Sequence, residues 1–282
     1  MTMQLSLFNQ RWRLRRDSYR PAGEPINPRL YEVAELVGDR EAKAFIVTHH
    51  YSGSYPNARF RFGLFTGGEL VGVTVFSHPC NDRVLTSVFP VSASDSVELG
   101  RFVLLDLVPA NGESWFLARA FECLRRKGLA GVVSFSDPVP RTKMDGTIIH
   151  RGHFGICYQA TSATFLGRTE PRTLRLLPDG TVLNDRAIQK IRAGEQGCQY
   201  AAALLEKFGA APPPVEERTE WLASWLARLT RRLRHSGNYK YAWAIAPDAR
   251  RFLPASLPYP KPGGLPNGPA VPSLRINLDS KP

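Results

Sequence analysis

Apolar runs separated by turn residues dominate the first half of the chain. Two of them, "RFRFGLFT" and "ELVGVTVFS", are joined by Gly67-Gly68. Paired glycines between such runs predict a hairpin, because the tight turn needs positive φ angles. A longer run, "VELGRFVLLDLV" (97–108), is rich in Val and Leu, which is typical of a central strand buried on both faces.

The next stretch changes from strand to helix periodicity. Residues 109–128 carry an apolar helical face that ends at Gly128, a natural stop signal, and "AGVVSFSDP" (130–138) is a second buried strand. This strand–helix–strand order predicts a βαβ unit in which the two strands lie parallel and close together.

The remaining pattern predicts the domain organisation. Residues 1–26 are basic and contain two prolines, which predicts a flexible arm. The catalytic domain is expected over 27–246, with a helical insertion at 184–236 before a last strand at 238–245. Frequent prolines predict an extended tail over 247–282.

Composition narrows the class of protein. The chain has 282 residues, 43% of them apolar, enough for one sizeable core. No run approaches the ~18 apolar residues of a membrane span, and the N-terminal charges follow the apolar residues, unlike a secretory signal. We therefore expect a soluble, cytoplasmic protein. The four cysteines lack metal-site spacing.

The charge of the chain points to a polyanionic partner. The formal net charge is +12 and arginine is the commoner cation, which suits phosphate recognition. The alternative is the composition of a high-GC genome, in which arginine replaces lysine without any ligand. Two basic clusters are candidates for contacts with DNA phosphates, one in the arm and one near the end of the insertion: Arg13, Arg15 and Arg16, and Arg228, Arg231, Arg232 and Arg234.

Several short polar segments are candidates for chemistry, each with a structural alternative. "HHYSG" (49–53) could be a ligand or substrate group, or only a polar helix end. "SFSDP" places Asp137 after a buried strand, where open α/β sheets carry site residues or a capping turn. Glu98 and Arg101 interrupt an apolar strand. Either both make separate salt bridges at the strand edge, or Arg101 meets an anionic cofactor or a DNA phosphate.

The loop "PANGESWFL" opens the helix after the buried strand. Asn111 or Gly112 lies at the helix N-terminus and Ser114 in its first turn, and free N–H groups there can bind phosphate. Further on, "HRGHFGICYQAT" places polar groups, including His153 and Tyr158, beside a short helix; a loop of solvated histidines is the alternative reading.

The order of these segments resembles the GNAT acyltransferase layout, and more closely the bacteriophage Mom-type DNA-modification proteins. The resemblance rests on "HHYSG", "RFGLFTGGELVGVTVFSHP", "ELGRFVLLDLVPANGESWFL", "VVSFSDP" and "GHFGICYQATSATFLG", and covers roughly residues 40–245. It implies a GNAT-like α/β (α+β) fold: a mixed central sheet with splayed parallel strands and flanking helices.

The resemblance also implies a reaction. Mom-type proteins convert adenine in DNA to an N6-methylcarbamoyl (acetamido-type) derivative, which protects phage DNA from host restriction. His50, Tyr51 and Asp137 match a set proposed to bind iron, a shell that His49 or His153 could complete if a metal binds. Arg101, Ser114 and Tyr158 match positions assigned to cofactor binding or catalysis, with Asn111 and Gly112 in the loop expected to receive the donor. That donor is acetyl-CoA or a related activated molecule, since "VPANGES" is poorer in glycine than the usual pyrophosphate loop.

We therefore expect double-stranded DNA as the partner, no membrane, and an oligomeric state, monomer or dimer, that the sequence leaves open. Adenine N6 is a weak nucleophile that is paired in a duplex, so the base is expected to flip out. Asp137 would orient or deprotonate the amine, and Tyr158 would protonate the leaving group. The alternatives are a GNAT-family N-acyltransferase acting on a protein or small-molecule amine, and a DNA-binding protein without catalysis.

Overall fold

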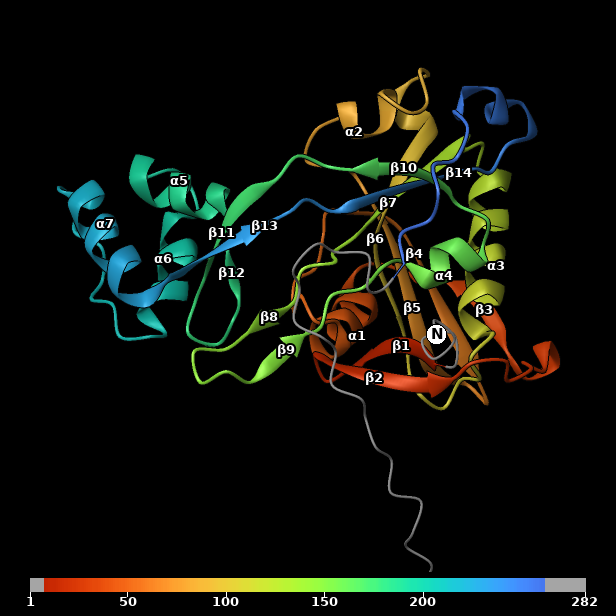
Figure 1. Ribbon diagram of the computed structural model, residues 1–282, viewed down its shortest axis with the longest axis horizontal. Coiled ribbons are helices and arrows are strands. Elements are labelled where there is room, and N and C mark those ends of the chain that lie inside the picture. Colours follow the sequence, from red (N-terminus) through yellow and green to blue (C-terminus); the bar gives the residue numbers. More distant parts are fainter. Residues whose placement is uncertain (1–7, 262–282) are drawn as a thin grey trace, which may run out of the picture.

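The centre of the molecule is one seven-stranded sheet (Figure 1). The computed structural model describes residues 8–261, so most of the proline-rich tail expected over 247–282 lies outside the described residues. The spatial order of the strands is β10 (Thr164–Arg168), β14 (Tyr239–Ala244), β7 (Gly131–Ser136), β6 (Ser96–Leu104), β5 (Glu69–Ser77), β4 (Ala58–Thr66) and β3 (Glu32–Glu35). The predicted hairpin at Gly67-Gly68 is confirmed, with both glycines at positive φ.

The βαβ unit predicted from the sequence is also confirmed. Strand β6 leads into helix α3 (Gly112–Arg126), which returns to β7, and β6–β7 is the only parallel pair among the described strands of this sheet. The parallel pairing covers only Ser96–Leu99 against Gly131–Ser134. Beyond it the strands separate, and the β5–β6 register shifts at Gly100. The fold is therefore mixed α/β with splayed parallel strands, as expected.

Two layers cover the sheet. Helices α3 and α4 (Ile156–Ala160) pack on one face, over a core that includes Phe62, Phe76 and Phe116. Helix α1 (Arg40–His49) packs on the other, where Ile46 contacts Val73 and Val75. The short helix α2 (Arg83–Thr86) follows β5 and contacts β6 and β7. No helix among residues 8–261 is long and apolar enough to cross a membrane.

The N-terminal region differs from the flexible arm predicted over 1–26. Residues 8–21 form an antiparallel hairpin of β1 (Phe8–Arg13) and β2 (Arg16–Pro21) on the same side as α1 (Figure 1). The reason is burial: Arg11 and Trp12 are 3% and 7% exposed. The arginine count hid the alternation of the strand, and the prediction of a flexible arm is wrong for this segment.

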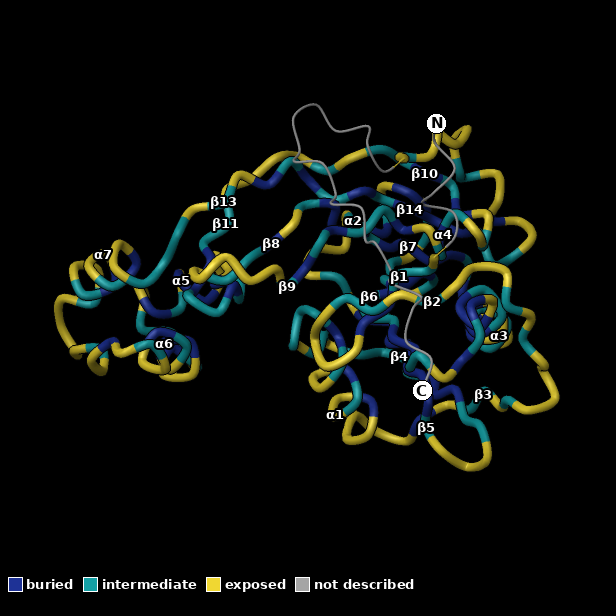
Figure 2. Tube along the Cα trace, turned by 60° about the horizontal axis from the view of Figure 1, so that its bottom comes forward, coloured by how far each residue is buried: buried dark blue, intermediate teal, exposed yellow. Residues whose placement is uncertain are grey.

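A satellite subdomain, residues 172–235, projects from one side of the main sheet (Figures 1 and 2). Its sheet has the order β12 (Val182–Leu183), β11 (Arg172–Leu176) and β13 (Arg231–His235), and it carries helices α5 (Asp185–Ala193), α6 (Cys198–Glu206) and α7 (Arg218–Leu229). A separate apolar cluster holds the helices together. The insertion thus contains helices before the last strand β14, but it begins earlier than residue 184 and includes a sheet.

Candidate functional site

A cavity of about 350 Å³ follows β6 where the two parallel strands separate. Its lining includes every β6 residue from Glu98 to Leu104, a length of roughly 20 Å at about 3.3 Å per residue. One end reaches the start of α3, through Arg11 and Glu113, and the other reaches the satellite subdomain, through Arg172 and Val182. The gap between splayed strands therefore forms an elongated site.

Most of the residues singled out in the sequence line this one cavity. His50, Tyr51, Arg101, Asp137 and Tyr158 all contribute to its wall, although they come from four separate segments. The loop residues expected to hold the donor do not: Asn111, Gly112 and Ser114 are absent from the lining. The Ser114 hydroxyl donates to the carbonyl of Asn111 at 3.2 Å, so it is used within the helix start.

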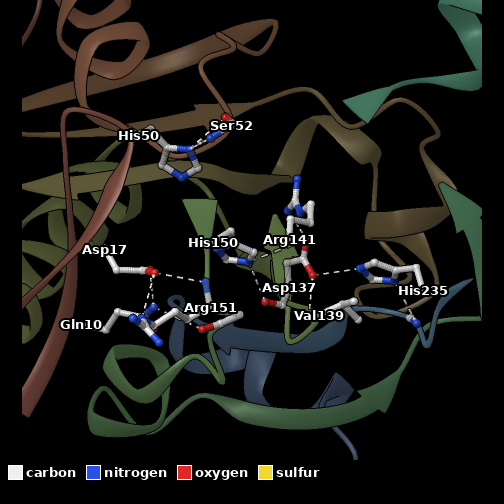
Figure 3. A network of polar contacts seen from close by, with 12 residues as sticks. Gln10, Asp17, His50, Ser52, Asp137, Val139, Arg141, His150, Arg151 and His235 are labelled. Carbon is white, nitrogen blue, oxygen red and sulfur yellow. Dashed lines mark hydrogen bonds and ion pairs between the residues drawn. The ribbon is translucent and has the colours of Figure 1, made fainter. Parts of the chain in front are cut away.

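Asp137 follows β7 and is held by a dense set of donors (Figure 3). His235 Nε2 lies 2.8 Å from Oδ1, the Val139 amide donates to the same oxygen at 3.0 Å, and the Arg141 guanidinium binds Oδ2. The Gly237 amide donates to His235 Nδ1 at 3.0 Å, so Nε2 carries the proton toward the carboxylate.

These donors set the protonation state of Asp137. Burial would raise the pKa of this carboxyl, but the hydrogen bond from His235 and the positive charge of Arg141 outweigh it and hold the pKa far below its usual range. A carboxylate with so low a pKa is a weak proton acceptor near neutral pH. Of the two roles expected from the sequence, orienting or deprotonating the amine, the geometry fits the orienting role better.

Aromatic rings and neutral imidazoles form a cluster in and behind the cavity wall, where Trp12, His50, Tyr51 and His153 line the cavity and His150 packs against Tyr51. Trp12, from the unexpected hairpin, lies 4.5 Å from the Tyr51 ring, which stacks on His150 at 4.2 Å and 11°. Burial lowers the pKa of His150 to about 3 and of His153 to about 4, and lowers that of His50 as well. These imidazoles are therefore neutral at physiological pH.

Tyr158 and Arg101 face the same space. Burial raises the pKa of Tyr158, so its hydroxyl keeps its proton and can act as a donor. Arg101 donates from Nε and Nη2 to the Ser54 carbonyl and hydroxyl at 2.9 and 2.8 Å, and from Nη1 to the Gly100 carbonyl at 2.6 Å. This network fixes the guanidinium in the cavity wall beside "HHYSG".

Glu98 is a candidate proton acceptor that the sequence motifs did not indicate. It lines the cavity and makes no ion pair or side-chain hydrogen bond with any residue between 8 and 261. Burial raises the pKa of its carboxyl, although Arg101 opposes the shift. The sequence does show a charged residue inside an apolar strand, which could have drawn attention to Glu98. It does not show that the carboxylate lacks a partner among the described residues.

The set proposed to bind iron does not fit a metal. Both carboxylate oxygens of Asp137 are occupied by His235 and by the Arg141 cation, which stands where a metal cation would have to approach. Burial also raises the pKa of Tyr51 to about 12, which disfavours a phenolate ligand. Within residues 8–261, no group of three or more His, Cys, Asp or Glu side chains could hold a metal ion.

The predicted DNA contacts occupy two places. Arg13, Arg15 and Arg16 are exposed at the hairpin turn, where the Arg15 amide donates to the carbonyl of His49 at 2.9 Å. On the satellite, the cationic residues near 231 lie on strand β13 and not on a helix. Arg232 and Arg234 are exposed there, whereas Arg231 donates to Thr142 at 2.7 Å. Arg228 lies over the Trp225 ring at the end of α7.

A family model described as the Mom protein family matches residues 31–261 of the chain. No curated protein matches it significantly. Among solved structures, an acetyltransferase from Bacillus subtilis in complex with CoA is 10% identical, with 77% of this chain and 98% of that chain covered and a TM-score of 0.34. FeeM, an N-acyl amino acid synthase from uncultured soil microbes, is 12% identical, with 79% and 94% covered and a TM-score of 0.35.

Proposed function

This chain belongs to the Mom protein family, and we propose that it modifies adenine in DNA. The product would carry an N6-methylcarbamoyl (acetamido-type) group that protects phage DNA from restriction enzymes. The observation that supports this proposal most directly is the single cavity along β6. It is lined by His50, Tyr51, Asp137 and Tyr158, together with the unpaired carboxylate of Glu98.

The middle of the cavity suits an extruded purine. Flipping a base out of a duplex costs a few kcal/mol, which stacking in a snug pocket can offset. Trp12 and Tyr51 place aromatic rings in its wall, and the neutral His50 and His153 can donate or accept hydrogen bonds at the edge of the base.

The proton transfers follow from the protonation states. A bond forms between adenine N6 and the transferred carbon of the donor, while the bond from that carbon to its leaving group breaks. We propose that Glu98 accepts the N6 proton, because its raised pKa makes it a stronger base than Asp137. Tyr158, which keeps its proton, donates to the leaving group. Asp137 acts as a positioning residue.

The charge distribution supports DNA as the carrier of the adenine. The exposed hairpin cluster, Arg13, Arg15 and Arg16, adjoins "HHYSG", and the exposed Arg232 and Arg234 belong to the satellite that borders the far end of the cavity. Phosphate contacts on both sides would hold a duplex over the opening and make binding depend strongly on salt.

The experiment is mass spectrometry of nucleosides from cells that express the chain. We expect a modified deoxyadenosine, with its level reduced at least about 100-fold in Glu98→Gln, the usual scale for a lost general base. Glu69→Gln, an exposed glutamate on the β4–β5 turn, is the matched control and should equal the parent.

Other outcomes count against the proposal. DNA binding without any new nucleoside would indicate a non-catalytic protein. Acylated proteins or small amines in place of modified DNA would indicate a general N-acyltransferase. Parental modification by Glu98→Gln would remove Glu98 from the proton transfer.

A further inference from the structure

The start of α3 is the natural place for an anion in this fold, yet the protein's own carboxylates already occupy it. A helix N-terminus carries partial positive charge and unpaired N–H groups that favour phosphate. Here Glu24 Oε2 accepts a hydrogen bond from the Ala110 amide at 3.1 Å, and Glu113 lies in the first turn of the helix. The negative charge that the N-terminus of α3 favours is thus supplied by the protein's own Glu24 and Glu113.

The nearby cation is also fully used. Arg11 donates through Nε to Glu113 Oε1 at 2.7 Å, and through its two terminal nitrogens to the carbonyls of Leu105, Val108 and Pro109 at 2.9, 2.5 and 2.9 Å. Every nitrogen of the guanidinium therefore has a protein partner. A pyrophosphate arriving at this loop would find the Arg11 guanidinium already engaged.

Glu113 requires a hydrogen-bond donor from a ligand in the cavity. It is 6% exposed, lines the cavity, and its second oxygen, Oε2, has no hydrogen-bond partner within residues 8–261. A buried carboxylate oxygen without a donor is costly, and a ligand N–H removes that cost. The same oxygen repels a phosphate or carboxylate group.

From these contacts we propose that the α3 end of the cavity binds the hydrogen-bond-donating end of a small activated donor, an amide or ammonium group, with Glu113 as its acceptor. The pyrophosphate of a coenzyme A thioester is excluded from this end. The inference rests on the proposed function, because it concerns the donor of the group transferred to adenine. It assigns Glu113 as a specificity-determining residue and the β1–β2 hairpin as part of the donor site.

The test compares three probes on the full chain without DNA: acetamide, acetate and acetyl-CoA. Acetamide and acetate have nearly the same shape and differ in charge and in N–H donors. By ligand-observed NMR titration we expect acetamide to bind at least 10-fold more tightly than acetate. We expect acetyl-CoA to leave hydrogen exchange of residues 105–115 unchanged. Equal binding of acetamide and acetate, or protection of 105–115 by acetyl-CoA, would overturn the proposal.

Two variants separate recognition from folding. Glu113→Gln should abolish the preference for acetamide over acetate, and the doubly neutral Arg11→Gln/Glu113→Gln keeps that readout available if the lone Arg11 cation prevents folding. Glu122→Gln, on the outer face of α3, is the matched control and should keep the preference. A preference that persists in both Glu113 variants would refute the assignment.

The two proposals fail in different ways. Nucleoside analysis in cells uses whatever donor the cell supplies. Modified deoxyadenosine together with acetyl-CoA bound at 105–115 would therefore refute only the inference about the donor. An intact acetamide preference without any modified nucleoside would count against the proposed function instead.

Discussion

Acidification should destabilise this protein through the imidazoles buried around the cavity. Burial lowers the pKa of His150 to about 3 and of His153 to about 4 in the folded state, whereas an unfolded histidine titrates near about 6.5. Because the folded pKa is the lower one, protons bind preferentially to the unfolded chain. The penalty is absent well above pH 6.5 and grows as the pH falls from about 6.5 toward 4.

The magnitude follows from linkage. Between pH 7 and pH 5 each of these histidines should cost about 2 kcal/mol of folding free energy, or about 4 kcal/mol together. Asp137 has the opposite shift: its contribution is present above the unfolded pKa of about 3.9 and is lost only below it, so it leaves this window unchanged.

The assay is urea unfolding at both pH values, followed by tryptophan fluorescence. His153→Gln should remove about 2 kcal/mol from the loss between pH 7 and pH 5, because no proton-binding imidazole remains at that position. His78→Gln, at an exposed position, is the matched control and should retain the parental loss. An unchanged pH dependence in His153→Gln would refute the view that its imidazole is held neutral by burial.

Three further changes test other parts of the structure. Arg11→Met leaves Glu113 buried without its cation and should lower the unfolding free energy by about 3 kcal/mol or more. The double variant Arg11→Met/Glu113→Met should regain much of this stability. Equal loss in the two variants, measured by urea unfolding, would contradict the pairing. Arg232→Gln/Arg234→Gln should weaken DNA binding and lower the slope of log affinity against log salt by about 2, and an unchanged slope would place the phosphates elsewhere. Gly237→Ala should cost about 2 kcal/mol or more, since φ is +97° and a Cβ would lie 1.9 Å from the Thr169 carbonyl oxygen; a melting temperature equal to that of the parent would argue against this backbone conformation.

The sequence predicted the parts of the fold that local patterns determine. The Gly67-Gly68 turn and the βαβ unit follow from periodicity and turn chemistry, and the structure has both. The N-terminal hairpin was missed because its arginines suggested solvent, while Arg11 is buried by carbonyls almost one hundred residues away. A contact of that range leaves no trace in the local pattern.

In the site, too, residues in local motifs could be predicted from the sequence, whereas residues brought in by long-range contacts could not. Short motifs pointed to His50 and Asp137, and both line the β6 cavity. Residues that depend on assembly escaped: Trp12 belongs to the misjudged arm, and His235 looked like the end of a basic helix. The base role given to Asp137 depended on its charge partners, which only the three-dimensional arrangement supplies.

His235 links the satellite subdomain directly to the cavity. It is the last residue of β13, just before the chain re-enters the main sheet as β14, and its ring reaches back to Asp137. Deleting residues 172–235 would therefore remove, together with the satellite, the imidazole that donates a hydrogen bond to Asp137 in the cavity wall. The satellite and the main sheet are therefore joined at the cavity by the hydrogen bond between His235 and Asp137.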